Sequence, residues 1–293
     1  MRYTILLLVV CAACTSQPSI GTLKTNIETR LSAVKGTFAV AFADIETGNT
    51  LLINEHETFH AASTMKTPVM IEVYKQVNAG KFSLTDSIEI KNEFKSIVDS
   101  SLYNLNPEDD SETELYKMIG QKRTLASLVY DMIIVSSNLA TNIVIEQVGA
   151  THVTQSMREL GASDIQVLRG VEDNKAYEKG MNNTTTAYDL MVIFEKMATR
   201  KTVSPEASDA MIQILLDQRF NDIIPAQLPP EVKVAHKTGS ITGVHHDSGI
   251  VMLPNGKRYV LVLLSKNLED TNAGTIALAD ISRMIYEYVM ANP

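Results

Sequence analysis

The order of helical and strand-like hydrophobic periods constrains the fold of this chain most strongly. Apolar residues recur at helical spacing over residues 22–36, and two β-rich runs then flank "ETGNT", a hairpin signal, within residues 37–59. A long, mainly helical middle part follows. Three strand-like runs fill residues 232–266, with "PNGK" as a tight turn, and a helical run over residues 277–291 closes the chain.

This order predicts a mixed α/β (α+β) fold. The early and late strands can join one antiparallel five-stranded sheet with the flanking helices packed on it, while the middle part makes an all-helical lobe. We therefore expect one catalytic domain over residues 20–293. Its α/β lobe would span about residues 20–62 and 225–293, and its helical lobe about residues 63–224. Clefts between lobes are common ligand sites.

The composition excludes several classes of protein. The 293 residues are 45% hydrophobic and 20% charged, which is enough for a sizeable core. The net charge of −8, without any run rich in Lys and Arg, argues against a nucleic-acid partner. No second long apolar run follows the first residues, so an integral membrane protein is not expected.

The first residues have the pattern of a secretory signal. A positive start, an apolar run and then small residues predict a signal peptide over residues 1–13. The sequence "CAAC" resembles a lipoprotein site at which Cys14 would be lipidated; ordinary cleavage one or two residues earlier is the alternative. Both cysteines, Cys11 and Cys14, lie here, so the mature protein would have no disulfide. We expect an exported protein, periplasmic or attached to a bacterial membrane by lipid.

The stretch "HAASTMKTPVM" carries a hydroxyl, Ser63, and an amine, Lys66, on one helix face. An amine beside a hydroxyl can take its proton when burial or a second cation lowers the pKa of the amine. A serine at a helix start also lies near backbone N–H groups that favour developing negative charge. The motif alone is not specific, because Ser32 and Lys35 repeat it on a helix predicted to be exposed.

Two further motifs follow in order. "IIVSSNLATN" places Ser136, Ser137 and Asn138 on a turn between apolar helical runs. "VAHKTGSITG" places Lys237, Thr238, Gly239 and Ser240 on a strand, where the glycine lets a ligand approach the backbone closely. Taken separately, the first could be a helix cap and the second a solvated edge charge.

Together and in this order, the three motifs resemble those of penicillin-recognising serine enzymes, and the chain from about residue 20 resembles a class A β-lactamase. The resemblance implies the β-lactamase/transpeptidase-like fold and a serine hydrolase that opens the β-lactam amide through an acyl-enzyme. It implies a small-molecule β-lactam as substrate, antibiotic resistance as the consequence, and no cofactor or metal. We also expect a monomer.

The resemblance also assigns the catalytic residues of acylation. Ser63 would be the nucleophile, Lys66 its proton partner, and Ser136 the relay of a proton to the leaving nitrogen. The backbone N–H groups of Ser63 and Ser240 would form the oxyanion hole.

Substrate-binding roles follow from the same resemblance. Asn138 and the backbone carbonyl of Ser240 would bind the side-chain amide of the substrate. Lys237 and Thr238 would face its carboxylate, and Gly239 lies between these groups and Ser240. The charge of Lys237 would also keep the pKa of Lys66 low.

Hydrolysis of the acyl-enzyme needs a carboxylate that activates water, and "LRGVEDNKAYEKGMNNTTTA" resembles the loop that supplies it. Glu172 is the leading assignment and Asp173 the alternative. Asn183 stands where the family usually has an aspartate, which removes a charge from any pair with Arg169. Ala176 is near the usual position of an asparagine that helps to hold the water.

Other departures from the family concern the rest of the cleft. Ser137 replaces the usual aspartate of the second motif, which suggests different hydrogen bonds around the turn. "GVHHDSG" lacks the arginine that often binds the substrate carboxylate, and His245 or His246 would partly replace it. We interpret "HHD" as alternating polar residues rather than a metal site, because no further Cys/His cluster is near. Residues 92–120 read as an inserted loop with one short helix, able to form a wall of the cleft.

Two other functions share the acylation step. A D,D-peptidase or an esterase-type serine hydrolase would use the same nucleophile on peptide or ester substrates. A slowly deacylating penicillin-binding sensor would acylate and remain acylated. The loop glutamate favours the β-lactamase, whereas the altered loop keeps both alternatives open.

Overall fold

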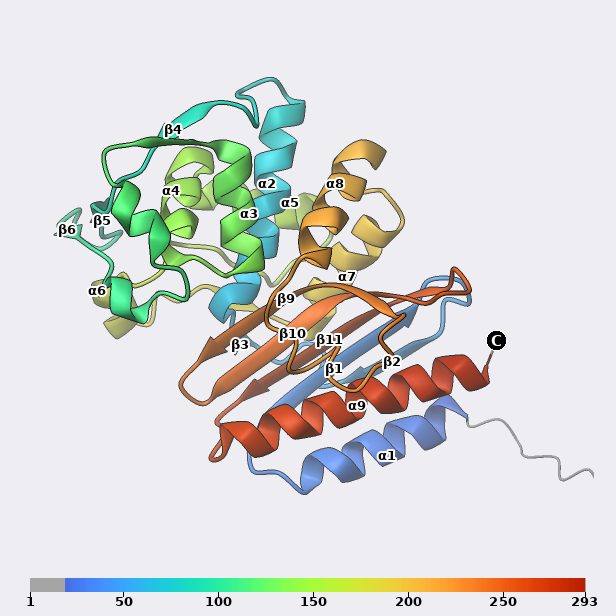
Figure 1. Ribbon diagram of the computed structural model, residues 1–293. Helices are drawn as coiled ribbons and strands as arrows, with labels where there is room; N and C mark the ends of the chain where they lie inside the picture. The colour runs from blue at the N-terminus through green and yellow to red at the C-terminus, as the bar shows by residue number, and fades with distance from the viewer. Residues whose placement is uncertain (1–18, 293) are drawn as a thin grey trace, which may run out of the picture.

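The central element of the computed structural model, which describes residues 19–292, is a five-stranded antiparallel sheet (Figure 1). Its strand order is β2-β1-β11-β10-β9. The strands span Thr37–Asp44 (β1), Thr50–Ile53 (β2), Lys233–Ile241 (β9), Val244–Met252 (β10) and Arg258–Lys266 (β11). The predicted sheet and its hairpins are confirmed. The predicted signal peptide over residues 1–13 and the lipidation of Cys14 lie outside the described residues.

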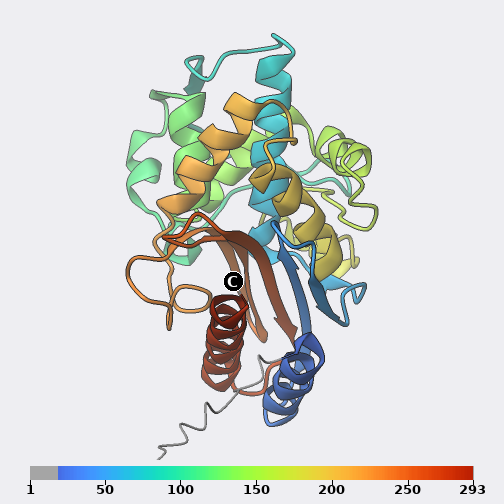
Figure 2. The ribbon, with the colours of Figure 1, turned by 90° about the vertical axis from the view of Figure 1, so that its right-hand side faces the viewer.

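Both faces of the sheet are covered, so its inner strands are apolar on both sides. Along β1, Ala39, Ala41 and Ala43 belong to the core shared with the helical lobe, while Phe38, Val40 and Phe42 belong to the core on the other face. The small residues let the helix α7 (Ala187–Ala198) lie close to the sheet. The larger residues pack under α1 (Ile20–Ser32) and α9 (Thr271–Ala291), which lie side by side (Figures 1 and 2).

The remaining helices gather beyond the other face (Figure 2). The helix α2 (Lys66–Asn78) is buried along most of its length, including Lys66, Thr67 and Glu72. Around it lie α3 (Leu125–Ile134), α4 (Asn138–Val148), α5 (Ala150–Glu159) and α8 (Pro205–Leu216). The short helix α6 (Asn174–Glu178) lies within the loop that carries Glu172.

The segment over residues 92–120, predicted as an inserted loop with one short helix, has two short 3₁₀ helices and no α-helix. It contains a short hairpin of β5 (Phe94–Lys95) and β6 (Leu102–Tyr103). Two 3₁₀ turns follow, η2 (Pro107–Asp109) and η3 (Glu114–Met118). Asn106 caps η2 and Pro107 opens it, as is usual at a helix start.

Two helix boundaries also differ from the periodicity. The segment predicted to be helical from Ser63 begins as the 3₁₀ turn η1 (Ala62–Met65), and α2 starts only at Lys66. The last helix begins at Thr271, six residues before the apolar period, because Asp270 accepts a hydrogen bond from the N–H of Ala273 as its N-cap. A side-chain cap therefore sets the start of α9, whereas α2 follows the 3₁₀ turn without one.

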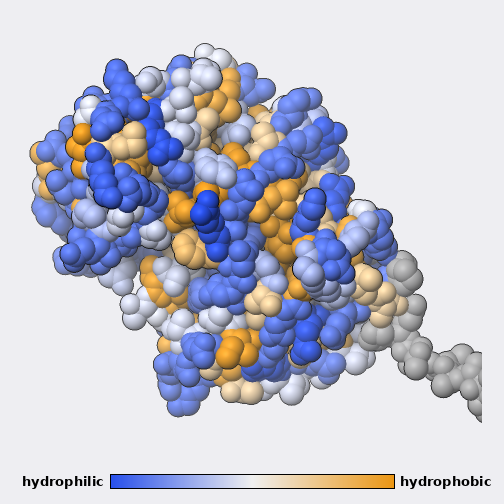
Figure 3. Space-filling model, viewed as in Figure 1, coloured by the Kyte–Doolittle hydropathy of each residue, from blue (hydrophilic) through white to orange (hydrophobic). Residues whose placement is uncertain are grey.

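Three small pairs of strands complete the structure. β3 (Phe59–His60) pairs with β8 (Thr184–Thr185), and β4 (Ser87–Glu89) pairs with β7 (Lys122–Thr124). The β3–β8 pair joins the residues just before η1 to the end of the loop that carries Glu172. On the face seen in Figure 3, apolar residues are scattered among polar ones. Across residues 19–292, no helix has the length and apolar character to cross a membrane.

Candidate active site

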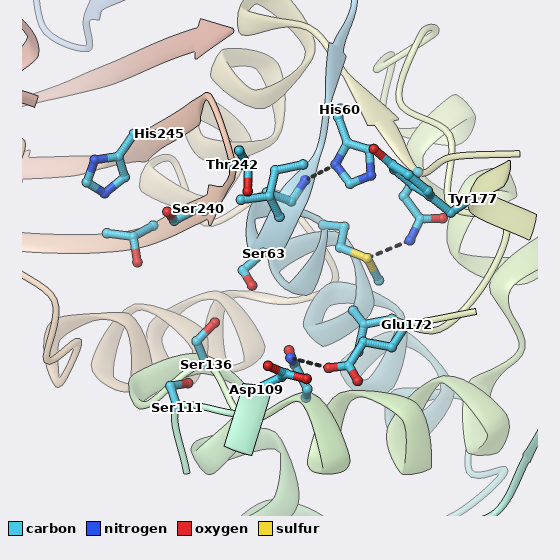
Figure 4. Close-up of a pocket in the computed structure, with 18 of the residues that line it drawn as sticks. His60, Ser63, Asp109, Ser111, Ser136, Glu172, Tyr177, Ser240, Thr242 and His245 are labelled. Atoms are coloured by element: carbon cyan, nitrogen blue, oxygen red, sulfur yellow. Dashed lines mark hydrogen bonds between the residues drawn. The ribbon is translucent and has the colours of Figure 1, made fainter. Parts of the chain in front are cut away.

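A cavity of about 830 Å³ opens between the sheet edge and the helical lobe (Figure 4). Of the nine site residues predicted from the sequence, seven line it: Ser63, Ser136, Asn138, Glu172, Thr238, Gly239 and Ser240. The other two, Lys66 and Lys237, are fully buried. Figure 4 shows Ser63 between Ser240 on the strand side and Ser136 and Glu172 on the lobe side. Three separate parts of the chain therefore converge on one hydroxyl.

Ser63 lies in η1, pressed against the edge strand β9. A Cβ atom on Gly239 would come within 3.1 Å of the backbone nitrogens of Ser63 and Thr64. Only a glycine allows this approach without displacing one of the two segments. Within the described part of the chain, the Ser63 hydroxyl has no hydrogen-bond partner, so it is free to react with a bound ligand.

Lys66 Nζ donates three hydrogen bonds within the wall of the cavity. Its acceptors are the Ser136 carbonyl at 2.8 Å, Ser136 Oγ at 3.1 Å and Asn138 Oδ1 at 3.0 Å. Burial lowers the pKa of Lys66 to about 7, against the opposing effect of the Asp110 and Glu172 carboxylates, which raise it. The amine therefore changes charge close to neutral pH.

Lys237 Nζ approaches the Ser136 hydroxyl from the side of the sheet. It donates to Ser136 Oγ at 3.1 Å and to the Thr238 carbonyl at 3.0 Å. Burial lowers the pKa of Lys237 well below its ordinary value, and the charge of Lys66 lowers it further. The low pKa of Lys66 thus comes from burial, because a fully buried ammonium loses its hydration, and not from the charge of Lys237 as expected from the sequence.

Asn138 connects the lysine to the carboxylate across the cavity. Its Oδ1 accepts from Lys66, while its Nδ2 donates to Glu172 Oε1 at 2.9 Å. Burial raises the pKa of Glu172, and the Asn138 hydrogen bond opposes this by stabilising the anion. A half-buried carboxylate of raised pKa, turned toward a cavity, suits proton transfer.

Three residues of the site hold strained backbone conformations. The φ angles of Ala62, Ser136 and Glu172 are 45°, 57° and 61°. Such left-handed conformations cost roughly 1–2 kcal/mol for a residue with a Cβ. They precede or carry groups that line the cavity, as expected where surrounding contacts enforce a functional geometry.

Asp173, the alternative carboxylate, has structural partners. It is only 2% exposed, and it accepts from Ser96 Oγ at 2.8 Å, from the Ile97 N–H at 2.9 Å and from the Ala176 N–H at 3.2 Å. It therefore caps α6 and ties the loop to residues 94–97. Both Glu172 and Asp173 line the cavity, but these three bonds occupy the Asp173 carboxylate, so the geometry favours Glu172.

Arg169 and Asn183 do not pair through their side chains. The guanidinium of Arg169 donates to the Met181 and Gly170 carbonyls and to Asn182 Oδ1. Asn183 instead binds the backbone around Arg169, as acceptor for its N–H at 3.2 Å and as donor to its carbonyl at 2.9 Å. A neutral amide can make both bonds at once, whereas an aspartate could only accept.

The adjacent residues His245 and His246 have different surroundings. His245 lines the cavity, with Nδ1 2.6 Å from Thr275 Oγ1. His246 is fully buried; its Nε2 lies 3.0 Å from the His60 carbonyl, and burial lowers its pKa to about 4. His246 is therefore wrong as a replacement for the missing arginine, because it is neutral and faces away. Among residues 19–292, no group of three or more His, Cys, Asp or Glu side chains is placed to hold a metal ion.

Some residues of the cavity were missed by sequence reasoning. Phe220 and Asp222 come from the loop after α8, and Asn174 begins α6. Ala176 is fully buried, so it does not face the cavity, while Asn174 two residues earlier does. No local pattern marks these positions. Asp109 and Ser111 also line the cavity, as expected for the 92–120 segment.

The fold and this arrangement of residues define a penicillin-recognising serine enzyme. A model of the β-lactamase enzyme family matches residues 22–289. The chain therefore belongs to the β-lactamase enzyme family, and the family and fold predicted from the three motifs are confirmed.

Individual proteins of known structure or function are similar over nearly the whole chain. Beta-lactamase VEB-1 of Pseudomonas aeruginosa is 24% identical, over 92% of this chain and 90% of its own length. A β-lactamase structure from Sphaerobacter thermophilus has a TM-score of 0.77 at 28% identity, covering 91% of this chain and 97% of its own. The structure of PBP-A has a TM-score of 0.80 at 26% identity, covering 94% and 98%.

Proposed function

We propose that this protein is a serine β-lactamase that opens the β-lactam amide through an acyl-enzyme on Ser63 and hydrolyses that ester with Glu172. The observation that carries the proposal is the convergence of Ser63, Ser136 and Glu172 on one cavity, with Lys66 buried behind it. VEB-1 and the Sphaerobacter protein are β-lactamases, and a PBP-A variant is known as an acyl-enzyme complex with penicillin G, which supports this chemistry.

The acylation step uses the amines of Lys66 and Lys237 and the Ser136 hydroxyl that lies between them. Ser63 Oγ attacks the lactam carbonyl carbon, its proton passes to neutral Lys66, and the C–N bond then breaks. Ser136 gives its proton to the leaving nitrogen and is reprotonated from Lys66, to which it is hydrogen-bonded. The backbone N–H groups of Ser63 and Ser240 would hold the oxyanion.

The binding residues act at the two ends of the substrate. Lys237 Nζ donates to Ser136 Oγ from behind the site, and Thr238 and Ser240 line the cavity where a substrate carboxylate would lie. Asn138 would exchange one of its present hydrogen bonds for the side-chain amide of the substrate. His245 stands at the same side as these hydroxyls, in place of the arginine.

Deacylation uses the carboxylate on the opposite side. Glu172 takes a proton from water, the water oxygen attacks the ester carbon, and Ser63 leaves with a proton to restore the enzyme. Asn174, two residues after Glu172, lines the cavity and is an amide that could hold this water. Export, lipidation of Cys14 and a monomeric state stay predictions from the sequence.

Mass spectrometry of the protein with penicillin G over time tests the proposed function. We expect a transient adduct of one penicillin, followed by free enzyme and hydrolysed penicillin. An adduct that persists for hours would favour the sensor, and the absence of any adduct or turnover would favour a hydrolase of other substrates.

The pH dependence of acylation follows from Lys66. Its pKa of about 7 means that the amine is charged, and unable to accept a proton, below that pH. We expect the single-turnover acylation rate to rise about tenfold per pH unit below pH 7 and to level off above it. A rate that is constant from pH 5 to 9 would rule out Lys66 as the base.

Gly239→Ala should slow acylation. The added Cβ would lie 3.1 Å from the Ser63 nitrogen, so β9 and η1 must separate by a few tenths of an ångström. A displacement at the reacting atoms lowers the rate steeply, and we expect kcat/KM to fall about tenfold or more. The matched control is Gly21→Ala in α1, where the Cβ position has only Ser19 Oγ within 4 Å, at 3.7 Å, and which should keep kcat/KM.

A further inference from the structure

Asp110 is a buried carboxylate that the mechanism above does not use. It lies between η2 and η3, outside every motif, and is only 8% exposed. A carboxylate at such a depth is costly unless donors surround it. Its partners are therefore informative about what it holds in place.

The donors to Asp110 come mainly from the turn that carries the second motif. Both carboxylate oxygens lie 2.9 Å from the Asn138 N–H, and Oδ2 also accepts from the Leu139 N–H at 2.9 Å. Oδ2 accepts in addition from the Tyr116 hydroxyl at 2.9 Å, and Oδ1 from the Glu112 N–H at 3.3 Å. The carboxylate thus caps the first residues of α4, where negative charge is most favourable.

The neighbouring residue holds the other side of the same turn. Ser111 Oγ donates to the Val135 carbonyl at 2.5 Å, directly before Ser136. Ser136 sits between these two contacts with its strained φ of 57°. The segment of residues 110–111 therefore contacts the turn on both sides of the strained residue.

Ser137 explains why such a contact is needed. The family resemblance expects an aspartate here, and this chain has a buried serine. Its hydroxyl accepts from the Ala140 N–H at 3.2 Å, which caps the helix but brings no charge. The carboxylate missing from the motif is present in the same turn, supplied by Asp110 from 27 residues earlier in the sequence.

We propose that Asp110 is a positioning residue for catalysis, which holds Asn138 so that its amide can bridge Lys66 and Glu172. The inference rests on the proposed function of this site. Asp110 acts through Asn138 and touches neither the substrate nor the reacting atoms.

Electrostatics separates this role from a purely structural one. The Asp110 charge raises the pKa of Lys66 and that of Glu172. Lys66 also interacts with the charges of Glu172 and Lys237, and Glu172 with that of Asp109, but those groups remain when Asp110 is changed. Removing the Asp110 charge should therefore lower both pKa values.

The test is the pH profile of kcat/KM for penicillin G in Asp110→Asn. We expect kcat/KM at neutral pH to fall about tenfold to a hundredfold, since a hydrogen bond to a charged group is lost. The acid limb should move to lower pH by about one unit. Glu108→Gln, an exposed acid on the same segment, is the matched control and should change neither value.

The double variant Asp110→Asn/Ser137→Asp returns a carboxylate to the turn and should recover part of the rate and of the limb position. It also decides the question if Asp110→Asn alone does not fold. If the wild type is active and Asp110→Asn changes neither kcat/KM nor the acid limb of its pH profile, the inference is wrong. It is also wrong if Asp110→Asn lowers the plateau of kcat/KM while the acid limb stays at the same pH. A folded but inactive double variant would overturn it too. A wild type that forms no penicillin adduct would instead overturn the proposed function.

Discussion

Ser63→Ala should abolish the covalent penicillin adduct and lower kcat/KM for penicillin G by about 10⁴-fold or more. Ser63 lines the cavity at the start of η1, and the bond to the acyl group is made by its Oγ alone. The alanine keeps the backbone N–H proposed for the oxyanion hole and leaves Lys66 buried. The measurement is intact-protein mass spectrometry together with steady-state kinetics.

Ser32→Ala is the matched control for this change. Ser32 begins the other Ser-x-x-Lys sequence, but it is exposed at the end of α1, and Lys35 pairs with Glu269 on the surface. This variant should acylate and turn over like the wild type. A penicillin adduct on the Ser63→Ala protein would show that another residue is the nucleophile.

Glu172→Gln should trap penicillin on Ser63. The amide keeps the shape and can still accept from Asn138 Nδ2, but it cannot take a proton from water. We expect deacylation to slow by about 10²- to 10⁴-fold while acylation continues, so that the adduct accumulates to one per enzyme. Mass spectrometry after rapid mixing and quenching measures both steps.

Asp173→Asn distinguishes the two loop carboxylates. Asp173 accepts three hydrogen bonds that hold the loop, and an asparagine can replace only some of them. We expect a lower free energy of unfolding, by about 1–3 kcal/mol, without accumulation of adduct. Trapping in Asp173→Asn and normal turnover in Glu172→Gln would reverse the assignment.

The sequence was sufficient where the signal is local. Hydrophobic patterns predicted the five strands, their antiparallel arrangement in one sheet and most of the helices, because the side chains that cover a core must be apolar. The resemblance of the three motifs and of the Glu172 loop to class A β-lactamases implied the nine site residues. Seven of them share one cavity in the structure.

Local patterns were less successful where a boundary depends on polar contacts. The start of α9 is set by the Asp270 cap, and that of α2 by the η1 turn, neither of which changes the apolar period. The 92–120 segment has too few apolar residues for a period, so its hairpin was not predicted and only one short helix was expected.

Only the tertiary structure decided which polar groups meet across long separations in the chain. In the structure, His246 is a buried, neutral partner of the His60 carbonyl, and Asp173 caps α6. Asp110 contacts the turn at Asn138. The physical reason is that burial and hydrogen-bond satisfaction depend on neighbours from other segments, and these set both the charge and the direction of a side chain. The sequence alone therefore determined the architecture and the chemistry available, while packing determined which residues are placed to use it.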